Sequence, residues 1–183
     1  TIVANLSGIE LHAKLKIDKD AQFNVIIDPS TGDNLNVSGV ADLDFNMEKN
    51  GRMTLTGRYD IYDGHYELSL YNLVKRKFEL EKGSSVVWRG DPLDAELNVT
   101  AKYEVDASAS SLMSSQTAGS SEEVQNRYRQ QLPFQVFLNV KGELNKPILE
   151  FSLDMPEESR GAIDGTVYSR IKQLNGENDE LNK

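Results

Sequence analysis

Residues 94–105 read DAELNVTAKYEV, in which every odd-numbered residue is apolar and every even-numbered residue is polar. Side chains alternate between the two faces of a β-strand, so this pattern predicts a strand with one buried face and one wet face. The same alternation recurs at residues 9–17, 35–47, 53–61, 132–140 and 149–155. Strands with one wet face are typical of antiparallel sheets. The sequence therefore predicts an all-β fold of long amphipathic antiparallel strands.

Short turn sequences separate these stretches. Lys49-Asn50-Gly51 joins two alternating runs, and Asn-Gly in that position is a strong signal for a β-hairpin. Asp63-Gly64 predicts the next reversal of the chain. Further reversals are expected at residues 29–33, 82–84, 89–92 and 145–147.

Residues 106–121 depart from the alternation. They are rich in Ser and Ala and show no periodicity, which predicts a flexible loop. A short helix is expected next, at residues 122–131, where Ser120 and Glu123 have the spacing of a capping box.

The C-terminal part has the spacing of a helix. Val167, Ile171 and Leu174 recur on one helical face, and Asn175-Gly176 is a sequence that can end such a helix. The expected division of the chain is a β-rich domain at residues 1–156, which includes the loop and the short helix, and a short helical or frayed segment at residues 157–183.

The composition limits the classes of function. The formal net charge of -9 disfavours binding to the phosphate backbone of a nucleic acid. The absence of cysteine excludes disulfides and thiol catalysis, and no apolar run is long enough to predict a transmembrane helix. Because the sequence starts on Thr1 inside a strand-like pattern, we expect the chain to be a fragment of a longer protein.

No arrangement of residues predicts catalysis. His12 lies on the polar face of a predicted strand and His65 follows an expected turn, so both are expected at the solvated surface. Asp42 and Asp44 share a wet face; a weak cation site is the alternative to simple solvation there. The sequence lacks a phosphate-binding loop, a zinc-binding histidine pair and a serine nucleophile elbow. We expect no catalytic residue, no metal site, no cofactor and no enzymatic activity.

Lys75-Arg76-Lys77 forms a basic cluster between two apolar segments. Such residues at a hairpin end or on an edge strand discourage aggregation. The functional alternative is contact with a lipid head group or another anionic partner.

The predicted sheet has more apolar surface than helices to cover it. Four arrangements would shield these faces from water: a sandwich, a closed barrel, packing on another copy or domain, or an open trough that holds apolar cargo. General experience with β proteins favours the sandwich or the barrel. Composition does not choose among the four.

One stretch carries a more specific signal. Residues 57–103 read GRYDIYDGHYELSLYNLVKRKFELEKGSSVVWRGDPLDAELNVTAKY. This resembles the signature of the C-terminal domain of TamB, an envelope protein of Gram-negative bacteria. The residues that carry the signature are Gly57, Tyr59, Gly64, Tyr66, Phe78, Gly83, Trp88, Gly90, Asp91 and Pro92. Residues 132–156 resemble the next block of the family, and the Ser-rich insertion resembles Bacteroidetes-type members. The family usually continues past the point where this chain stops, so we expect its final strands to be missing here.

The resemblance implies a fold and a setting. TamB is similar to AsmA-like and other bridge-like lipid-transfer proteins, and its domain is an open, taco-like or half-barrel sheet with an apolar inner face. Members are anchored in the inner membrane, cross the periplasm and work with TamA or a related outer-membrane β-barrel protein. They are linked to phospholipid movement between the membranes and to outer-membrane protein assembly. Given the family, the trough becomes the leading arrangement.

The expected function is to hold apolar cargo such as phospholipid acyl chains. The candidate lining consists of Leu35, Val37, Leu43, Phe45, Leu55, Tyr59, Leu97, Val99, Ala101, Tyr103, Phe134, Val136, Leu138, Phe151 and Leu153. Two alternatives remain: a chaperone-like module that binds outer-membrane β-strand clients by β-augmentation, and a purely structural β-sandwich.

Overall fold

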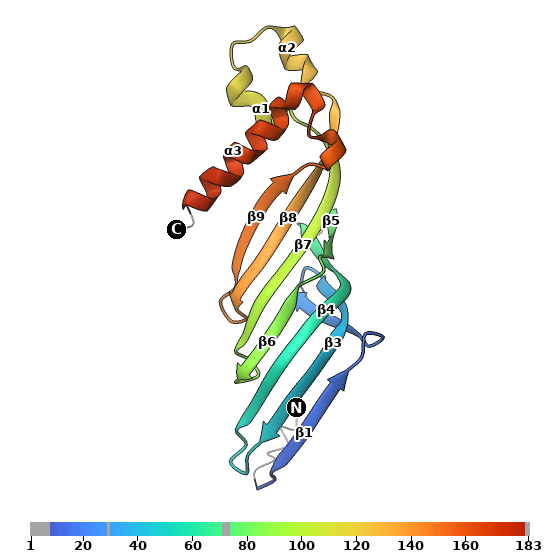
Figure 1. Cartoon of the computed structure of the whole chain (residues 1–183), viewed down its shortest axis with the longest axis vertical. Coiled ribbons are helices and arrows are strands. Elements are labelled where there is room, and N and C mark those ends of the chain that lie inside the picture. Colours follow the sequence, from blue (N-terminus) through green and yellow to red (C-terminus); the bar gives the residue numbers. More distant parts are fainter. Residues whose placement is uncertain (1–7, 29, 71–73, 182–183) are drawn as a thin grey trace. The chain divides into compact units, whose positions relative to one another are not determined.

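The computed structural model describes residues 8–28, 30–70 and 74–181, which contain nine strands and three α-helices (Figure 1). The strands are β1 Leu11–Ile17, β2 Gln22–Asp28, β3 Asp33–Met47, β4 Met53–Leu70, β5 Val74–Leu80, β6 Ser85–Gly90, β7 Ala95–Ser108, β8 Gln131–Glu143 and β9 Ile148–Asp154. The α-helices are α1 Ser110–Thr117, α2 Glu122–Arg127 and α3 Thr166–Leu181, and the short 3₁₀ helices are η1 Glu157–Ser159 and η2 Ala162–Gly165. The first residue of the turn predicted at 29–33 and the last two residues of the predicted C-terminal segment lie outside the described residues.

The strands belong to one nine-stranded sheet. Its order is β1-β3-β4-β5-β7-β8-β9, with β2 paired to β3 and β6 paired to β4 and β7. The order begins and ends on different strands, so the sheet is open within the described residues. The prediction of an open, mainly antiparallel sheet is confirmed, and the general expectation of a sandwich or a closed barrel is wrong.

The two longest strands, β3 and β4, each pair with two shorter strands along one edge. β1 pairs with the second half of β3 and β2 with the first half, both antiparallel. A turn closed by the hydrogen bond from the Ala21 N–H to the Asp18 carbonyl oxygen (3.0 Å) separates them. The chain therefore continues in one direction along β3 instead of folding back.

β5 and β6 are arranged along β4 in the same way: β6 pairs with its first half and β5 with its second half, both antiparallel. The prediction of a reversal at Lys82-Gly83-Ser84 is therefore wrong, because this segment only interrupts an edge. The Ser84 hydroxyl explains the difference: it donates to the Glu81 carbonyl oxygen (2.7 Å) and accepts from the Thr100 N–H (3.0 Å). These bonds satisfy backbone groups at the break, so the chain keeps its direction.

The prediction of a reversal at Asp63-Gly64 is also wrong, because β4 runs straight through it. Ser38 pairs with Asp63, whereas the next residue, Gly39, pairs with Ile61, which leaves Tyr62 as the extra residue of a β-bulge. Glycine suits bulges as well as turns. The bulge changes which residues face the apolar side, from odd-numbered before Tyr62 to even-numbered after it.

The chain is divided into two compact units. The first comprises the residues up to 101 together with 138–150, and the second comprises 102–137 together with the residues from 151 onward. The division runs through β7, β8 and β9, whereas the sequence suggests a boundary near residue 156.

The first unit buries apolar residues without a helix. The buried residues are Val37, Ala41, Leu43, Tyr59 and Ile61, and those packed around them are Ile17, Leu35, Leu55, Leu80, Val86, Trp88 and Val99. All of them lie on strands, and the described part of this unit contains no helix. We call the surface formed by these residues the apolar face. A flat single sheet would leave these side chains exposed, so their burial requires the sheet to bend toward the apolar face.

Two glycines of β4 permit this close packing. A Cβ atom on Gly57 would lie 2.4 Å from the Asp42 carbonyl oxygen of β3, and the φ angle of Gly57 is +133°. A Cβ atom on Gly64 would lie 2.3 Å from the Asn36 carbonyl oxygen. The backbones of β3 and β4 therefore approach each other at positions that only glycine can occupy without strain.

The second unit covers its apolar residues with helices. Its buried core consists of Ala109, Met113, Leu132, Phe134, Met155, Val167 and Ile171. Met113 lies on α1, inside the segment predicted as a flexible loop, so that prediction is wrong for residues 110–117. Burial of Met113 stabilises a helix that the local Ser-rich composition does not predict.

The helices at residues 122–131 and after residue 156 are confirmed, with differences at their ends. α2 is shorter than predicted, and its N-cap is Ser121, whose side chain makes no capping hydrogen bond, so the predicted capping box is absent. α3 does not end at Asn175-Gly176 but continues to Leu181. The Asn175 side chain bonds instead to a neighbouring strand.

We predict that Gly57→Ala lowers the free energy of unfolding by about 2–4 kcal/mol, because the new methyl group meets the Asp42 carbonyl oxygen and the backbone angle is strained. Gly90→Ala is the matched control, since a Cβ atom there meets no heavy atom within 4 Å. Urea titration should show a lower midpoint for Gly57→Ala alone. Equal midpoints for the two variants would contradict the close approach of β3 and β4.

Candidate functional site

The apolar face of the first unit carries much of the predicted lining. Leu35, Val37, Leu43, Leu55, Tyr59 and Val99 belong to its cluster. Phe45 pairs with Leu55 and Leu97 pairs with Val86, which places both on the same face. Ala101 and Leu138, also in this unit, are buried. Period-two alternation therefore places these predicted residues on one face of the sheet, whereas the cluster also contains Leu80, Val86 and Trp88, which the predicted lining does not include.

The remaining predicted lining residues lie in the second unit. Phe134 is buried in its core, and Leu153 packs against that core. Tyr103 and Val136 are half-buried, whereas Phe151 is exposed. Val167 and Ile171 of α3 belong to the same core, so the protein itself covers the apolar surface around Phe134.

The edge of the first unit formed by β1 and β2 is different, because its apolar side chains are exposed. Leu11, Leu15, Phe23 and Val25 retain 45%, 45%, 40% and 44% of their accessible surface. Each lies opposite an apolar residue of β3 in the antiparallel register, in the order Met47, Leu43, Val37 and Leu35. The apolar face thus continues to an edge that no other described strand covers.

The opposite face of the sheet is polar and rich in ion pairs. The Lys14 ammonium lies 3.2 Å from the Asp44 carboxylate, and Arg58 lies 2.5 Å from Asp60. His12 is exposed and bonded to Asn46 and Glu10, and these two bonds raise the pKa of His12 in that order of effect. Exposed contacts of this kind are typical of a solvated surface.

The Trp88 to Pro92 segment closes the β6–β7 hairpin. The Trp88 indole N–H donates to the Pro92 carbonyl oxygen (3.1 Å), and the Asp91 carboxylate accepts from the Leu93 N–H (2.8 Å). A further bond joins the Asp94 N–H to the Asp91 carbonyl oxygen (3.0 Å). These contacts give a structural reason for a Trp-x-Gly-Asp-Pro sequence, in which the indole fixes the turn.

The two signature tyrosines of β4 differ in one respect. The Tyr66 hydroxyl donates to the Asp33 carboxylate (3.0 Å). The Tyr59 hydroxyl is buried and has no hydrogen-bond partner among the described residues. Burial raises the pKa of Tyr59, so its phenol remains protonated and can act as a donor. Alternation predicts the place of Tyr59 on the apolar face but gives no sign of this unpaired hydroxyl.

The basic cluster at Lys75, Arg76 and Lys77 lies on β5 and is exposed. Arg76 pairs with Leu68, two positions from the Tyr66–Phe78 pair, and therefore shares the apolar side. The flanking lysines point to the other side, where Lys77 lies 3.3 Å from Glu79. The cluster is thus divided between two faces of the sheet. Because β5 lies between β4 and β7, the expectation of an edge strand is wrong.

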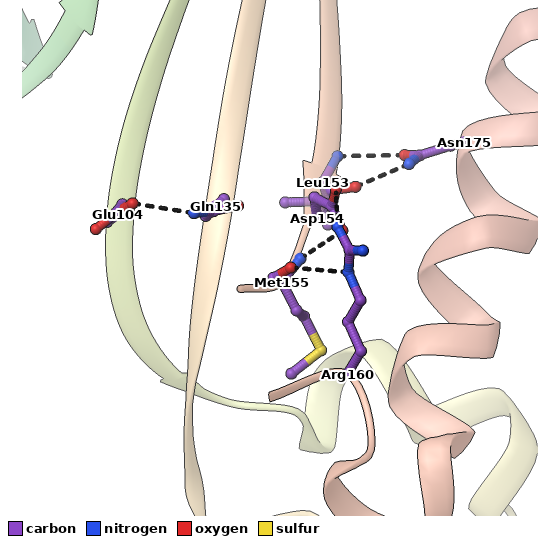
Figure 2. A network of polar contacts seen from close by, with 7 residues as sticks. All are labelled: Glu104, Gln135, Leu153, Asp154, Met155, Arg160 and Asn175. Atoms are coloured by element: carbon purple, nitrogen blue, oxygen red, sulfur yellow. Dashed lines mark hydrogen bonds and ion pairs between the residues drawn. The ribbon is translucent and has the colours of Figure 1, made fainter. Parts of the chain in front are cut away.

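In the second unit, α3 is fixed to the last strand by one side chain. The Asn175 amide donates to the Leu153 carbonyl oxygen (2.8 Å) and accepts from the Leu153 N–H (3.2 Å), so it bonds to β9 as a peptide group of a neighbouring strand would (Figure 2). Arg160 reinforces this end of β9 by donating to the Met155 carbonyl oxygen and the Asp154 carboxylate. No local signal in the sequence predicts this role of Asn175, since Asn-Gly also predicts a helix end.

A second polar contact joins β7 and β8 in this unit. The Gln135 amide donates to the Glu104 carboxylate (3.0 Å), as Figure 2 shows. This bond, followed by the contact with Lys102, lowers the pKa of Glu104. Because Glu104 is exposed, the contact contributes little to stability and mainly fixes the register of the two strands.

Metal centres and membrane-spanning helices are both missing from residues 8–28, 30–70 and 74–181. No group of three His, Cys, Asp or Glu side chains in these ranges could hold a metal ion. None of the helices there has the length and apolar character needed to cross a lipid bilayer.

Residues 5–177, nearly the whole chain, match the family described as the TamB C-terminal domain. No curated protein matches the chain. The family match covers both units and agrees with the resemblance found in residues 57–103.

We predict that Asn175→Ala lowers the free energy of unfolding by about 1–3 kcal/mol, because the Leu153 backbone loses both of its bonds to α3. Hydrogen exchange at the Leu153 amide should become faster. Gln173→Ala is the control, since the Gln173 amide bonds to Glu177 on the exposed surface of the same helix. Unchanged exchange at Leu153 in Asn175→Ala would contradict the role of this side chain.

Proposed function

Because the chain belongs to the TamB C-terminal domain family, we propose that it is a non-enzymatic module that holds phospholipid acyl chains on the apolar face of its first unit. One observation carries the proposal: the described part of this unit has no helix of its own to cover the face, and its β1–β2 edge exposes apolar side chains. An exposed apolar edge next to a buried apolar surface is typical of binding sites for apolar ligands.

The energetics of the proposal are those of simple transfer from water. Each methylene group of an acyl chain that leaves water for this face contributes about 0.8 kcal/mol. Apolar contact has no preferred direction, so a chain can slide along the strands while its head group stays in water. The proposed role needs no catalytic residue and no cofactor.

The family supplies the proposed setting. The module would act in the periplasm of a Gram-negative bacterium, within a protein anchored in the inner membrane. Its partners would be a TamA-like outer-membrane β-barrel protein and phospholipid, in transport between the two membranes and in outer-membrane protein assembly. Support for this setting is the family match, and the negative charge of the chain argues against nucleic acid as a partner.

We predict that Leu97→Asp reduces bound phospholipid at least several-fold, because a carboxylate on the apolar face raises the cost of placing an acyl chain there. The variants would be purified without detergent, and their lipids extracted and quantified. Asn98→Asp is the matched control, since it adds the same charge on the adjacent residue of β7, which is exposed on the polar face.

Leu15→Asp provides a second test that spares the core, because Leu15 is already 45% exposed on the edge strand. It should also lower the lipid content, with little change in the unfolding midpoint. Equal and negligible lipid in the wild type and in all three variants would overturn the proposal.

A second candidate function rests on the same edge. β1 and β2 each pair only with β3 in the described chain, so their outer backbone groups could pair with a strand of an unfolded outer-membrane protein. The apolar residues of the edge would then contact client side chains.

Site-specific photocrosslinking separates the two functions. A crosslinker at Lys16, on the polar side of β1, should capture a client protein if strand pairing occurs, whereas one at Val99 should capture lipid if the apolar face is the site. We expect lipid adducts at Val99 and no client adducts at Lys16. The reverse result would favour the client-binding function.

A further inference from the structure

Tyr59 is enclosed on the apolar face. It lies on β4 between Ala41 of β3 and Val86 of β6, and only 6% of its surface is accessible. Its ring lies against Gly39, where a Cβ atom would come within 2.8 Å of the Tyr59 Cζ atom. The Phe23 ring meets it edge-on, with the ring centroids 6.1 Å apart and the planes at 78°. The surroundings of this phenol are therefore apolar.

The Tyr59 hydroxyl has no partner among the described residues around it. Burying a hydroxyl without a hydrogen bond is unfavourable, and a phenylalanine would fill the same space without that cost. Tyr66 shows the usual solution on the same face, since its hydroxyl donates to Asp33. A buried unpaired donor on a candidate binding surface therefore indicates a ligand that brings its own acceptor.

The chemistry of the site restricts that ligand. A charged acceptor would pay a large desolvation cost beside Phe23, Val37 and Ala41, so the acceptor must be neutral. A water molecule could accept the hydrogen bond but would not cover the exposed apolar side chains of the β1–β2 edge. An acyl ester fits both requirements, because its carbonyl oxygen is a neutral acceptor attached to a long apolar chain.

Phe23 is a contact of Tyr59 that is itself accessible to solvent. It lies on the edge strand β2 and is 40% exposed, so its ring can change rotamer without disturbing a strand interior. The Tyr59 hydroxyl is buried, and the Phe23 ring contacts the Tyr59 ring edge-on. Displacement of the Phe23 side chain would open one side of the Tyr59 ring to a ligand.

We propose that the Tyr59 hydroxyl donates a hydrogen bond to the ester carbonyl oxygen of an acyl chain bound on the apolar face, and so makes the face selective for ester-linked lipids. The inference rests on the proposed function. It adds one hydrogen-bond donor at a fixed position to a surface that otherwise makes only apolar contacts. The acyl chain would then have a preferred resting position at Tyr59 during transfer.

The test uses vesicles that contain equal amounts of dioleoyl phosphatidylcholine and its diether analogue, which has the same chains but lacks the carbonyl oxygens. The whole chain is incubated with the vesicles and separated from them, and the two bound lipids are quantified by mass spectrometry. A neutral hydrogen bond corresponds to a preference of about threefold to tenfold. We expect this preference for the ester in the wild type and its loss in Tyr59→Phe.

Tyr66→Phe is the matched control, because it removes a hydroxyl from the same face that already has a partner. It should keep the wild-type preference while lowering the unfolding midpoint, whereas Tyr59→Phe should keep or raise the midpoint. Binding of both lipids without preference in the wild type, or an ester preference that persists in Tyr59→Phe, would overturn the inference and leave the proposed function intact. Failure of either lipid to bind any variant would overturn both.

Discussion

The pairing of β3 with β4 is the constraint on which the first unit depends. These strands carry the buried centre of the apolar face, and each provides the edge along which two shorter strands align. Gly57 and Gly64 allow the two backbones to approach closely, and the bulge at Tyr62 keeps apolar residues on one side of a strand whose alternation changes phase. A flat single sheet could not bury Tyr59 and Leu43 by contacts between strands alone, so the sheet must bend toward its apolar face.

The two units bury their apolar residues in different ways. In the second unit, α1 and α3 cover the apolar residues, and Asn175 bonds to the edge strand as another strand would. In the first unit, strand residues pack on one another, and the β1–β2 edge remains apolar and exposed, as at Leu15 and Val25. A closed hydrophobic core needs no ligand, whereas the described part of the first unit leaves apolar surface exposed that an apolar partner would remove from water. The proposed cargo site therefore belongs to the first unit.

Local patterns predict the strands well, because alternation reflects the backbone geometry of the strand itself. Most of residues 94–105 lie within β7 as expected. The predictions fail where contacts between residues far apart in the sequence determine the local structure. Asp63-Gly64 fits a turn or a bulge, and only its pairing with β3 selects the bulge. Similarly, α1 forms because Met113 is buried among residues far away in the sequence. Alternation also predicts the place of Val99 on the apolar face, but the unpaired hydroxyl of Tyr59 depends on neighbours that no local pattern reveals.

The central claim is that the apolar face of the first unit is the surface that receives acyl chains. The most direct test is photolabelling of the purified chain with a phospholipid that carries a diazirine on its acyl chain, followed by mapping of the adducts by mass spectrometry. We expect adducts at residues such as Leu15, Phe23, Leu97 and Val99. Adducts confined to the polar face of the sheet or to the helices of the second unit would contradict the claim.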